Sequence, residues 1–94
     1  MIKRFVKMTF KPESIEDFKS VFNTHKKLIS SFEGCSHLEL LQDVNNPVVF
    51  FTFSIWDDKK NLESYRQSSE FREIWGQTKL FFSQKAEAWS MKGL

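Results

Sequence analysis

The stretch Val48-Val-Phe-Phe-Thr-Phe-Ser-Ile-Trp56 is almost entirely apolar. Its β-branched and aromatic residues favour an extended strand, and they occupy both parities of that strand. A strand with one face in solvent alternates apolar with polar residues, whereas a strand covered on both faces does not. The segment therefore predicts a strand of a sheet that is covered on two sides.

Three further strands are predicted around this one. Residues 2–10 alternate, with Lys3, Phe5 and Lys7 on one parity and mainly apolar residues on the other. Residues 35–44 form a second predicted strand, and residues 85–92 form the last. The turn residues of Asp43-Val-Asn-Asn-Pro47 indicate that the second strand and the strand Val48–Trp56 form a hairpin.

Two helical regions separate these strands. In the first, apolar residues recur at steps of three and four, with Ser14 and Asp17 as a predicted capping box and Gly34 as the predicted end. The second is predicted as two pieces, residues 58–67 and 69–82. Asp57-Asp58 can cap the first piece, and Ser68-Ser69 interrupts the region.

The predicted order is βαββαβ, with the second helix broken in two. Its natural solution is an α+β fold, a four-stranded antiparallel sheet with helices on one face. The other face then carries exposed Phe and Ile, and an apolar patch of that size usually marks an interface. We therefore expect a homodimer in which two sheets pack face to face.

The composition describes one small folded domain, residues 1–94, with 40% hydrophobic and 28% charged residues. The net charge of +2 does not favour a nucleic-acid or membrane binder. No apolar run approaches the roughly 20 residues of a membrane helix, and no signal peptide is readable. The single Cys35 cannot form an internal disulfide, which indicates a cytoplasmic protein.

Motifs that bind cofactors or metals are missing from the sequence. There is no GxGxxG or P-loop, no CxxC or HExxH, and no GxSxG nucleophile elbow. We therefore expect no bound cofactor and no dedicated metal.

Two histidines are candidates for proton transfer. His37 is predicted to share a strand face with Cys35 and Glu39, where it either contacts a ligand or lies near solvent as a structural residue. His25 lies on the apolar stripe of the first helix, where it either faces a cavity or is a buried histidine bonded to a carbonyl.

Large aromatic residues are candidates for a ligand pocket, with Tyr65 as the polar group; the alternative is a plain core. The set comprises Trp56, Tyr65, Trp75 and Phe81. Arg66 and Arg72 could bind an anionic or phenolate oxygen, or form a solvated face. The basic residues of the first strand, Arg4 among them, are interpreted as charge protection of a sheet edge.

Several segments of the chain together resemble the antibiotic biosynthesis monooxygenase (ABM) family, over essentially its whole length. They are Lys7-Met-Thr-Phe-Lys-Pro-Glu13, Ile15-Glu-Asp-Phe18, Phe32-Glu-Gly-Cys35, Leu38-Glu-Leu-Leu-Gln-Asp43, Phe50 to Ser54 before Trp56, Tyr65-Arg-Gln-Ser68 with Phe71, and the Trp89 strand. The resemblance implies a ferredoxin-like α+β fold and a homodimer whose sheets form an α/β barrel.

The resemblance also implies an activity. ABM domains include cofactor-independent monooxygenases that oxidise quinols and polycyclic phenols with O₂ in a dry aromatic cavity. Tyr65 and Trp56 would then position the ring system, and His37 or His25 would take the proton. Arg66 or Arg72 would stabilise the oxyanion.

Haem-degrading relatives use an Asn, a Trp and a His at positions that align with Val6, Tyr65 and Trp75. None of the three matches, so haem degradation is not expected. Two other classes stay open. One is a non-catalytic ligand-binding or stress-related dimer of the same fold. The other is RNA recognition, which Phe5, Phe51 and Phe53 imitate, although the third strand lacks the required Gly and small residue.

Overall fold

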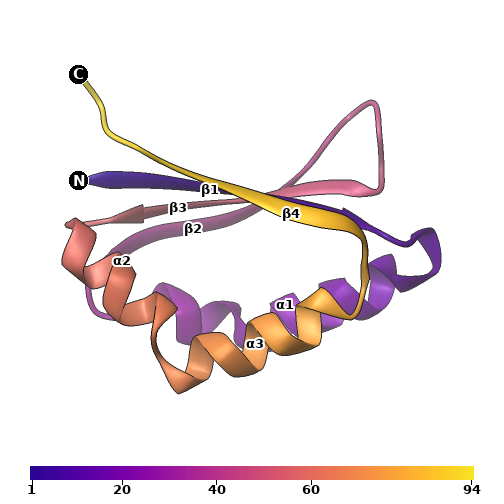
Figure 1. The fold of residues 1–94 in the computed structure, drawn as a ribbon, viewed down its shortest axis with the longest axis horizontal. Helices are drawn as coiled ribbons and strands as arrows, with labels where there is room; N and C mark the ends of the chain where they lie inside the picture. Colours follow the sequence, from indigo (N-terminus) through magenta and orange to yellow (C-terminus); the bar gives the residue numbers. More distant parts are fainter.

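All three α-helices pack on one face of a four-stranded antiparallel sheet in the computed structural model, which describes residues 1–94 (Figure 1). The strands are β1 (Ile2–Phe10), β2 (Cys35–Gln42), β3 (Val49–Trp56) and β4 (Phe82–Met91). Their order in the sheet is β2-β3-β1-β4. The predicted βαββαβ order and the ferredoxin-like α+β fold are confirmed.

Strand β1 lies in the middle of this sheet, hydrogen-bonded to β3 on one side and β4 on the other. The interpretation of its basic residues as protection of a sheet edge is therefore wrong. Arg4 pairs with Ser54 and Ser90 on the helix-covered face, whereas Lys3 and Lys7 lie on the opposite face.

The helical layer consists of α1 (Ile15–Ser30), α2 (Lys59–Arg66) and α3 (Ser69–Lys79). The predicted break between α2 and α3 is confirmed, and each new helix has its own cap. The Asp58 carboxylate accepts hydrogen bonds from the backbone N–H groups of Lys60 and Asn61, and the Ser68 hydroxyl accepts one from Phe71. Helix α3 ends three residues earlier than predicted, because Leu80 and Phe81 turn the chain into β4.

The predicted ends of α1 are wrong. Pro12–Ser14 form a turn of 3₁₀ helix (η1), so Ser14 already has helical dihedral angles and its side chain caps nothing. At the other end, Ser31 terminates α1. Gly34 lies beyond the helix, in the turn into β2, with φ of +86°. A β-carbon at Gly34 would overlap the side chain of Asn61.

The hydrophobic core gathers at one end of the sheet, where β1 ends and β3 and β4 begin. Met8, Phe10, Phe18 and Phe50 are all at most 2% exposed, and the Phe10 ring stacks on Phe18 with a centroid distance of 4.1 Å. Phe81 packs against this cluster. Phe81 does not line the cavity described below, so its predicted place in a ligand pocket is wrong: the turn that ends α3 directs it toward the core.

The sheet face away from the helices, which we call the outer face, has no covering element (Figure 1). Phe5 and Phe53 stack on it with a centroid distance of 4.9 Å, and the His37 ring lies 5.4 Å from Phe53. Trp89 and Met91 on β4 are 41% and 49% exposed. The outer face therefore presents apolar side chains to solvent.

Candidate functional site

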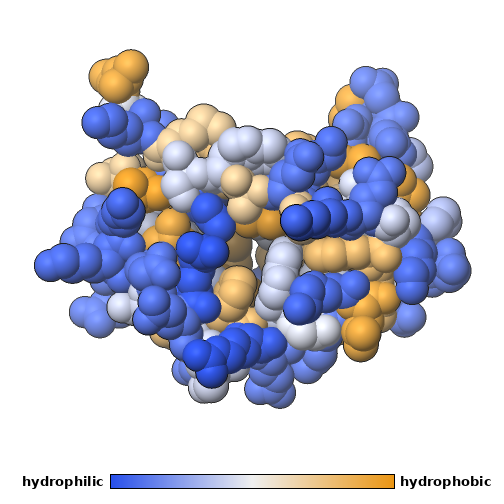
Figure 2. Space-filling view, viewed as in Figure 1, coloured by the Kyte–Doolittle hydropathy of each residue, from blue (hydrophilic) through white to orange (hydrophobic).

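A cavity of about 280 Å³ lies between the helices and the sheet, beside the core, whose Met8 and Phe18 help to line it. Hydrophobic residues make up 14 of the 20 that line it. Figure 2 shows a hollow on this side of the molecule, with apolar side chains inside it and hydrophilic residues around it. A small, largely apolar molecule fits such a space.

Four aromatic side chains form one continuous wall of the cavity. The Tyr65 ring stacks on Trp56 with a centroid distance of 5.0 Å and meets the edge of Phe71 at 5.2 Å. Phe71 in turn stacks on Trp75 at 5.9 Å. The break between α2 and α3 makes this wall possible, because it turns Tyr65 on one helix toward Phe71 and Trp75 on the next. The predicted aromatic pocket thus includes Trp56, Tyr65 and Trp75.

Trp56 is a structural part of that wall. It is 1% exposed, and its indole Nε1–H donates a hydrogen bond of 3.0 Å to the Ser54 hydroxyl. Its polar atom is therefore satisfied inside the protein. Trp56 offers a ligand only its apolar ring.

Tyr65 is the one residue lining the cavity that carries a phenolic hydroxyl. None of the side-chain hydrogen bonds of the structure involves this hydroxyl, and no unpartnered side-chain polar atom is fully buried, so solvent reaches it. Burial of the ring raises the pKa of Tyr65 far above its usual value, and the nearby Cys35 adds to the shift. Tyr65 therefore stays a phenol at neutral pH. It can donate a hydrogen bond but cannot act as a base.

Cys35 lies on the cavity side of β2, and the prediction that it shares a face with His37 is wrong. Cys35 pairs with Trp56 and His37 pairs with Ile55, so Ser36 is the extra residue of a β-bulge that reverses the parity. Burial raises the pKa of the Cys35 thiol. The thiol is therefore a weak nucleophile at neutral pH.

Neither histidine lines the cavity. His37 lies on the outer face, where its Nε2 is 3.0 Å from a carboxylate oxygen of Glu39. His25 is a half-buried residue of α1. Arg72 is exposed on α3 and also lies outside the cavity, whereas Arg66 lines it.

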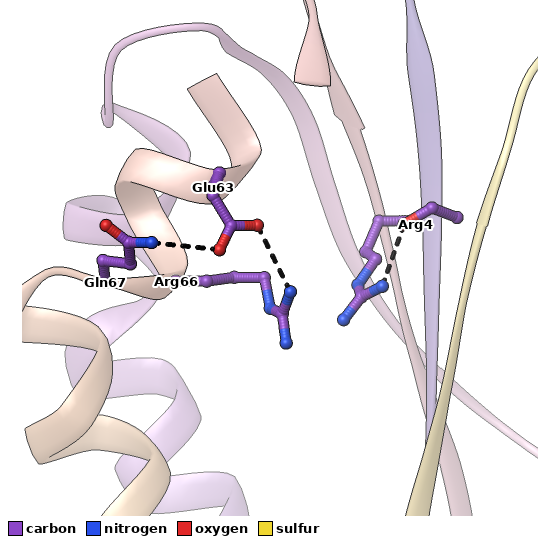
Figure 3. A network of polar contacts seen from close by, with 5 residues as sticks. Arg4, Glu63, Arg66 and Gln67 are labelled. Atoms are coloured by element: carbon purple, nitrogen blue, oxygen red, sulfur yellow. Dashed lines mark hydrogen bonds and ion pairs between the residues drawn. The ribbon is translucent and has the colours of Figure 1, made fainter. Parts of the chain in front are cut away.

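Arg4 is a cavity residue that sequence reasoning missed. Its side chain extends from β1 toward α2, and its guanidinium faces that of Arg66 (Figure 3). The Arg4 guanidinium donates to the Ser90 hydroxyl at 2.9 Å, and the Arg66 guanidinium lies 3.4 Å from a Glu63 carboxylate oxygen. Arg4 has the same parity as Ile2, Val6 and Met8. A charged residue among apolar residues of the same parity is the feature of the sequence that could have indicated a cavity residue.

The cavity has no set of residues suited to hold a metal. The structure contains no group of three or more His, Cys, Asp or Glu side chains placed to bind an ion.

None of its helices has the length and apolar character needed to cross a membrane.

Comparison with known proteins identifies the family. The sequence profile described as antibiotic biosynthesis monooxygenase matches residues 1–76. The chain belongs to the ABM family. No match was found among curated proteins. Val6, Tyr65 and Trp75 all line the cavity, and none provides an imidazole.

Solved structures share the ABM fold over nearly the whole chain. A conserved protein from Methanosarcina mazei is 22% identical with a TM-score of 0.92, covering 97% of this chain and 90% of its own. A protein described as an antibiotic biosynthesis monooxygenase is 18% identical with a TM-score of 0.92, covering 100% of this chain and 99% of its own. A provisionally named ABM protein from Nitrosomonas europaea is 15% identical with a TM-score of 0.91, with the same coverage. At these identities the likeness establishes the fold alone.

Proposed function

We propose that this protein is a monooxygenase that oxidises a compact aromatic, phenolic or quinol substrate with O₂ and without a bound cofactor. The observation that carries the proposal is the aromatic cavity, whose volume of about 280 Å³ suits a compact ring system. Membership of the antibiotic biosynthesis monooxygenase family supports monooxygenation as the reaction class. We also propose a cytoplasmic location, because the single Cys35 is a free thiol and free thiols are typical of reducing compartments.

The chemistry needs an electron-rich substrate that has lost a proton. For a phenolic anthrone, one atom of O₂ becomes the carbonyl oxygen at the ring CH₂ carbon. The other atom leaves as water with the two hydrogens of that carbon, so the substrate supplies all of the electrons. In the cavity, Tyr65 donates a hydrogen bond to the substrate oxygen and Arg66 stabilises its negative charge. The apolar walls formed by Trp56, Phe71 and Trp75 keep water away from the reactive anion.

A homodimer is part of the proposal. The outer face carries Phe5, Phe51, Phe53 and Ile55 on its two central strands, and Trp89 and Met91 beside them on β4. Apolar residues gathered on one face of a small domain favour association with a second copy, since association removes their surface from water.

Oxygen uptake tests the reaction. Purified protein is supplied with a panel of hydroquinones and phenolic anthrones, and uptake is corrected for the spontaneous rate. We expect Tyr65→Phe to lower the protein-dependent rate on the order of 100-fold, because one donor to the oxyanion is lost. Ser64→Ala is the matched control, since it removes an exposed hydroxyl from the same helix outside the cavity. Equal rates for both variants would remove Tyr65 from the mechanism.

The two histidines enter the same assay as a separate hypothesis. His25 and His37 lie outside the cavity, so a proton-transfer role for either needs a path that the monomer does not provide. His25→Gln and His37→Gln test that role directly. A rate that falls in one of these variants, with its fold intact, would identify the histidine that takes the substrate proton.

A non-catalytic ligand-binding dimer is the second candidate. One observation favours it: no imidazole lines the cavity, and Glu87, its one lining carboxylate residue, is an exposed residue of β4. A binding protein needs no such base. Ligand binding in the cavity without protein-dependent oxygen uptake across the whole substrate panel would favour this candidate.

A further inference from the structure

Two positively charged side chains face each other at a mainly apolar cavity. The guanidinium groups of Arg4 and Arg66 come from β1 and α2, which lie far apart in the sequence, and both line the cavity (Figure 3). Glu63 is the carboxylate beside them, and it contacts Arg66. One negative charge next to two positive charges leaves this part of the cavity with an excess of positive charge.

Each arginine is held in place by a different partner. The Arg4 guanidinium donates to the Ser90 hydroxyl of the neighbouring strand, and the Arg66 guanidinium lies 3.4 Å from the Glu63 carboxylate one turn earlier on α2. Gln67 donates to the second oxygen of the Glu63 carboxylate at 3.2 Å and so fixes that carboxylate on the helix surface. The two guanidinium groups thus have separate partners, and they face each other in the structure (Figure 3).

This arrangement is unfavourable without a ligand. Burial lowers the pKa of Arg4, Arg66 lowers it further, and Glu63 offsets part of the effect. Glu87 is not among the charges that act on Arg4. The apolar wall excludes solvent on one side of the pair, whereas solvent screens part of the repulsion on the other side, because 45% of the Arg66 side chain is exposed. An anion bound between the two guanidinium groups would remove this repulsion.

We propose that Arg4 and Arg66 together bind an anionic oxygen group of the ligand, so that the cavity selects a compact aromatic carboxylate over its neutral analogue. This inference rests on the proposed function, because it names the substrate class of the same cavity. Guanidinium groups suit the task, since their planar N–H donors match the two oxygens of a carboxylate. The ring of such a ligand would then extend along the wall of Tyr65 and Trp75.

Calorimetric titration with a matched pair of ligands tests the proposal. The pair is 2-naphthoate and 2-naphthamide, which have the same ring system and differ in the charge of the carbonyl group. We expect the naphthoate to bind about 10- to 100-fold more tightly at low salt, as is typical of a hydrogen-bonded charge pair. We also expect this preference to shrink as salt is raised.

Two variants locate the preference. Arg4→Gln and Arg66→Gln should each weaken naphthoate binding at least about tenfold and leave naphthamide binding within about twofold. Lys60→Gln is the matched control, because it removes one positive charge from the exposed surface of α2 outside the cavity. Without ligand, Arg66→Gln should melt at the same temperature as the parent protein or higher, because it relieves the repulsion on Arg4. A lower affinity in that variant is then not the result of unfolding.

The outcomes separate this proposal from the proposed function. Equal binding of naphthoate and naphthamide, or no binding of either, would overturn the anion site. A preference for naphthoate that survives both arginine variants would overturn it as well. A preference that both variants abolish would support it, even if oxygen uptake were never seen and the monooxygenase proposal failed.

Discussion

The two faces of the sheet are built from alternate residues of the same strands, and they differ in what they leave open. On the helix-covered face, β1 contributes Arg4, Val6 and Met8, and the helices enclose a cavity above them. On the outer face, the same strand contributes Phe5 between two lysines, and nothing covers it. The covered face holds a charged residue, whereas the open face is rich in aromatic rings.

The residue on each face that departs from the usual pattern indicates where function lies. A charged residue on a covered face loses hydration, so it persists where a ligand or partner compensates it. Aromatic residues on an open face lose nothing in the monomer but favour association. The cavity face is therefore the candidate site for a small molecule, and the outer face is the candidate site for a second copy.

The largest expected effect is a difference in the stability lost when one tryptophan on each face is replaced by alanine. Trp56 is 1% exposed beside the cavity, so Trp56→Ala should lower the free energy of unfolding by about 3–5 kcal/mol. Trp89 is 41% exposed on the outer face, so Trp89→Ala should lower it by less than about 1 kcal/mol in the monomer. Urea unfolding at low protein concentration measures both. Similar losses in the two variants would mean that Trp89 is buried in the monomer and would contradict the contrast between the faces.

The next effect concerns the outer face alone. Phe53 lies at its centre, stacked on Phe5 and beside His37, so Phe53→Asp places a charge where two sheets would meet. We expect the dimer to weaken by about 2 kcal/mol or more in sedimentation equilibrium. Asn23→Asp is the control, since it adds the same charge at an exposed position of α1. A parent protein that sediments as a monomer at micromolar concentration would refute the proposed dimer.

Most of the fold was predictable from the sequence because the strands have unambiguous patterns. The apolar run ending at Trp56 and the alternation of residues 2–10 were sufficient to define two strands, and Asp58 and Ser68 marked the starts of two helices. The ends of α1 were not predictable in the same way. Ser14 has the residue type of a cap, but the preceding Pro12 starts a 3₁₀ turn that makes Ser14 helical itself.

The candidate site was only partly predictable. Tyr65, Trp56 and Trp75 follow from helical and strand spacing, because large rings on facing elements meet. Strand alternation alone predicts that His37 and Cys35 share a face, since a single-residue bulge at Ser36 leaves no clear mark in the sequence. The central position of β1, and with it the place of Arg4, does not follow from the sequence, because strand order depends on pairing between distant segments.

Alkaline pH gives a smaller effect that reports on the cavity face. The folded protein holds the pKa of Tyr65 above its usual value of 10.0, whereas the unfolded chain does not. Stability from this group is therefore complete below about pH 10 and is lost as the pH rises above it, because only the unfolded chain releases the proton. Tyr65 is the only tyrosine, so tyrosinate absorbance follows it alone.

We expect tyrosinate absorbance to appear together with unfolding and not before it. Above about pH 10, Tyr65→Phe should lose less stability with rising pH than the parent protein, because it has no phenol to titrate. At neutral pH, the missing titration should change the stability little. Titration of Tyr65 near pH 10 in a protein that is still folded would contradict its burial beside Trp56.

The smallest expected change in stability concerns the solvent-facing surface of the helices. It tests whether that surface, unlike the cavity side, makes no functional contact. Gly76 follows Trp75 on α3, and a β-carbon there would meet no atom within 4 Å. Gly76→Ala should therefore raise the free energy of unfolding by about 0.5–1 kcal/mol, through helix propensity alone, and leave ligand binding unchanged. Gly34→Ala is the opposing control: with φ of +86° and Asn61 in the way, it should destabilise the protein. A loss of stability or of ligand binding in Gly76→Ala would show that the solvent-facing side of α3 also makes a functional contact. The molecule would then have a third functional surface, besides the cavity and the outer face of the sheet.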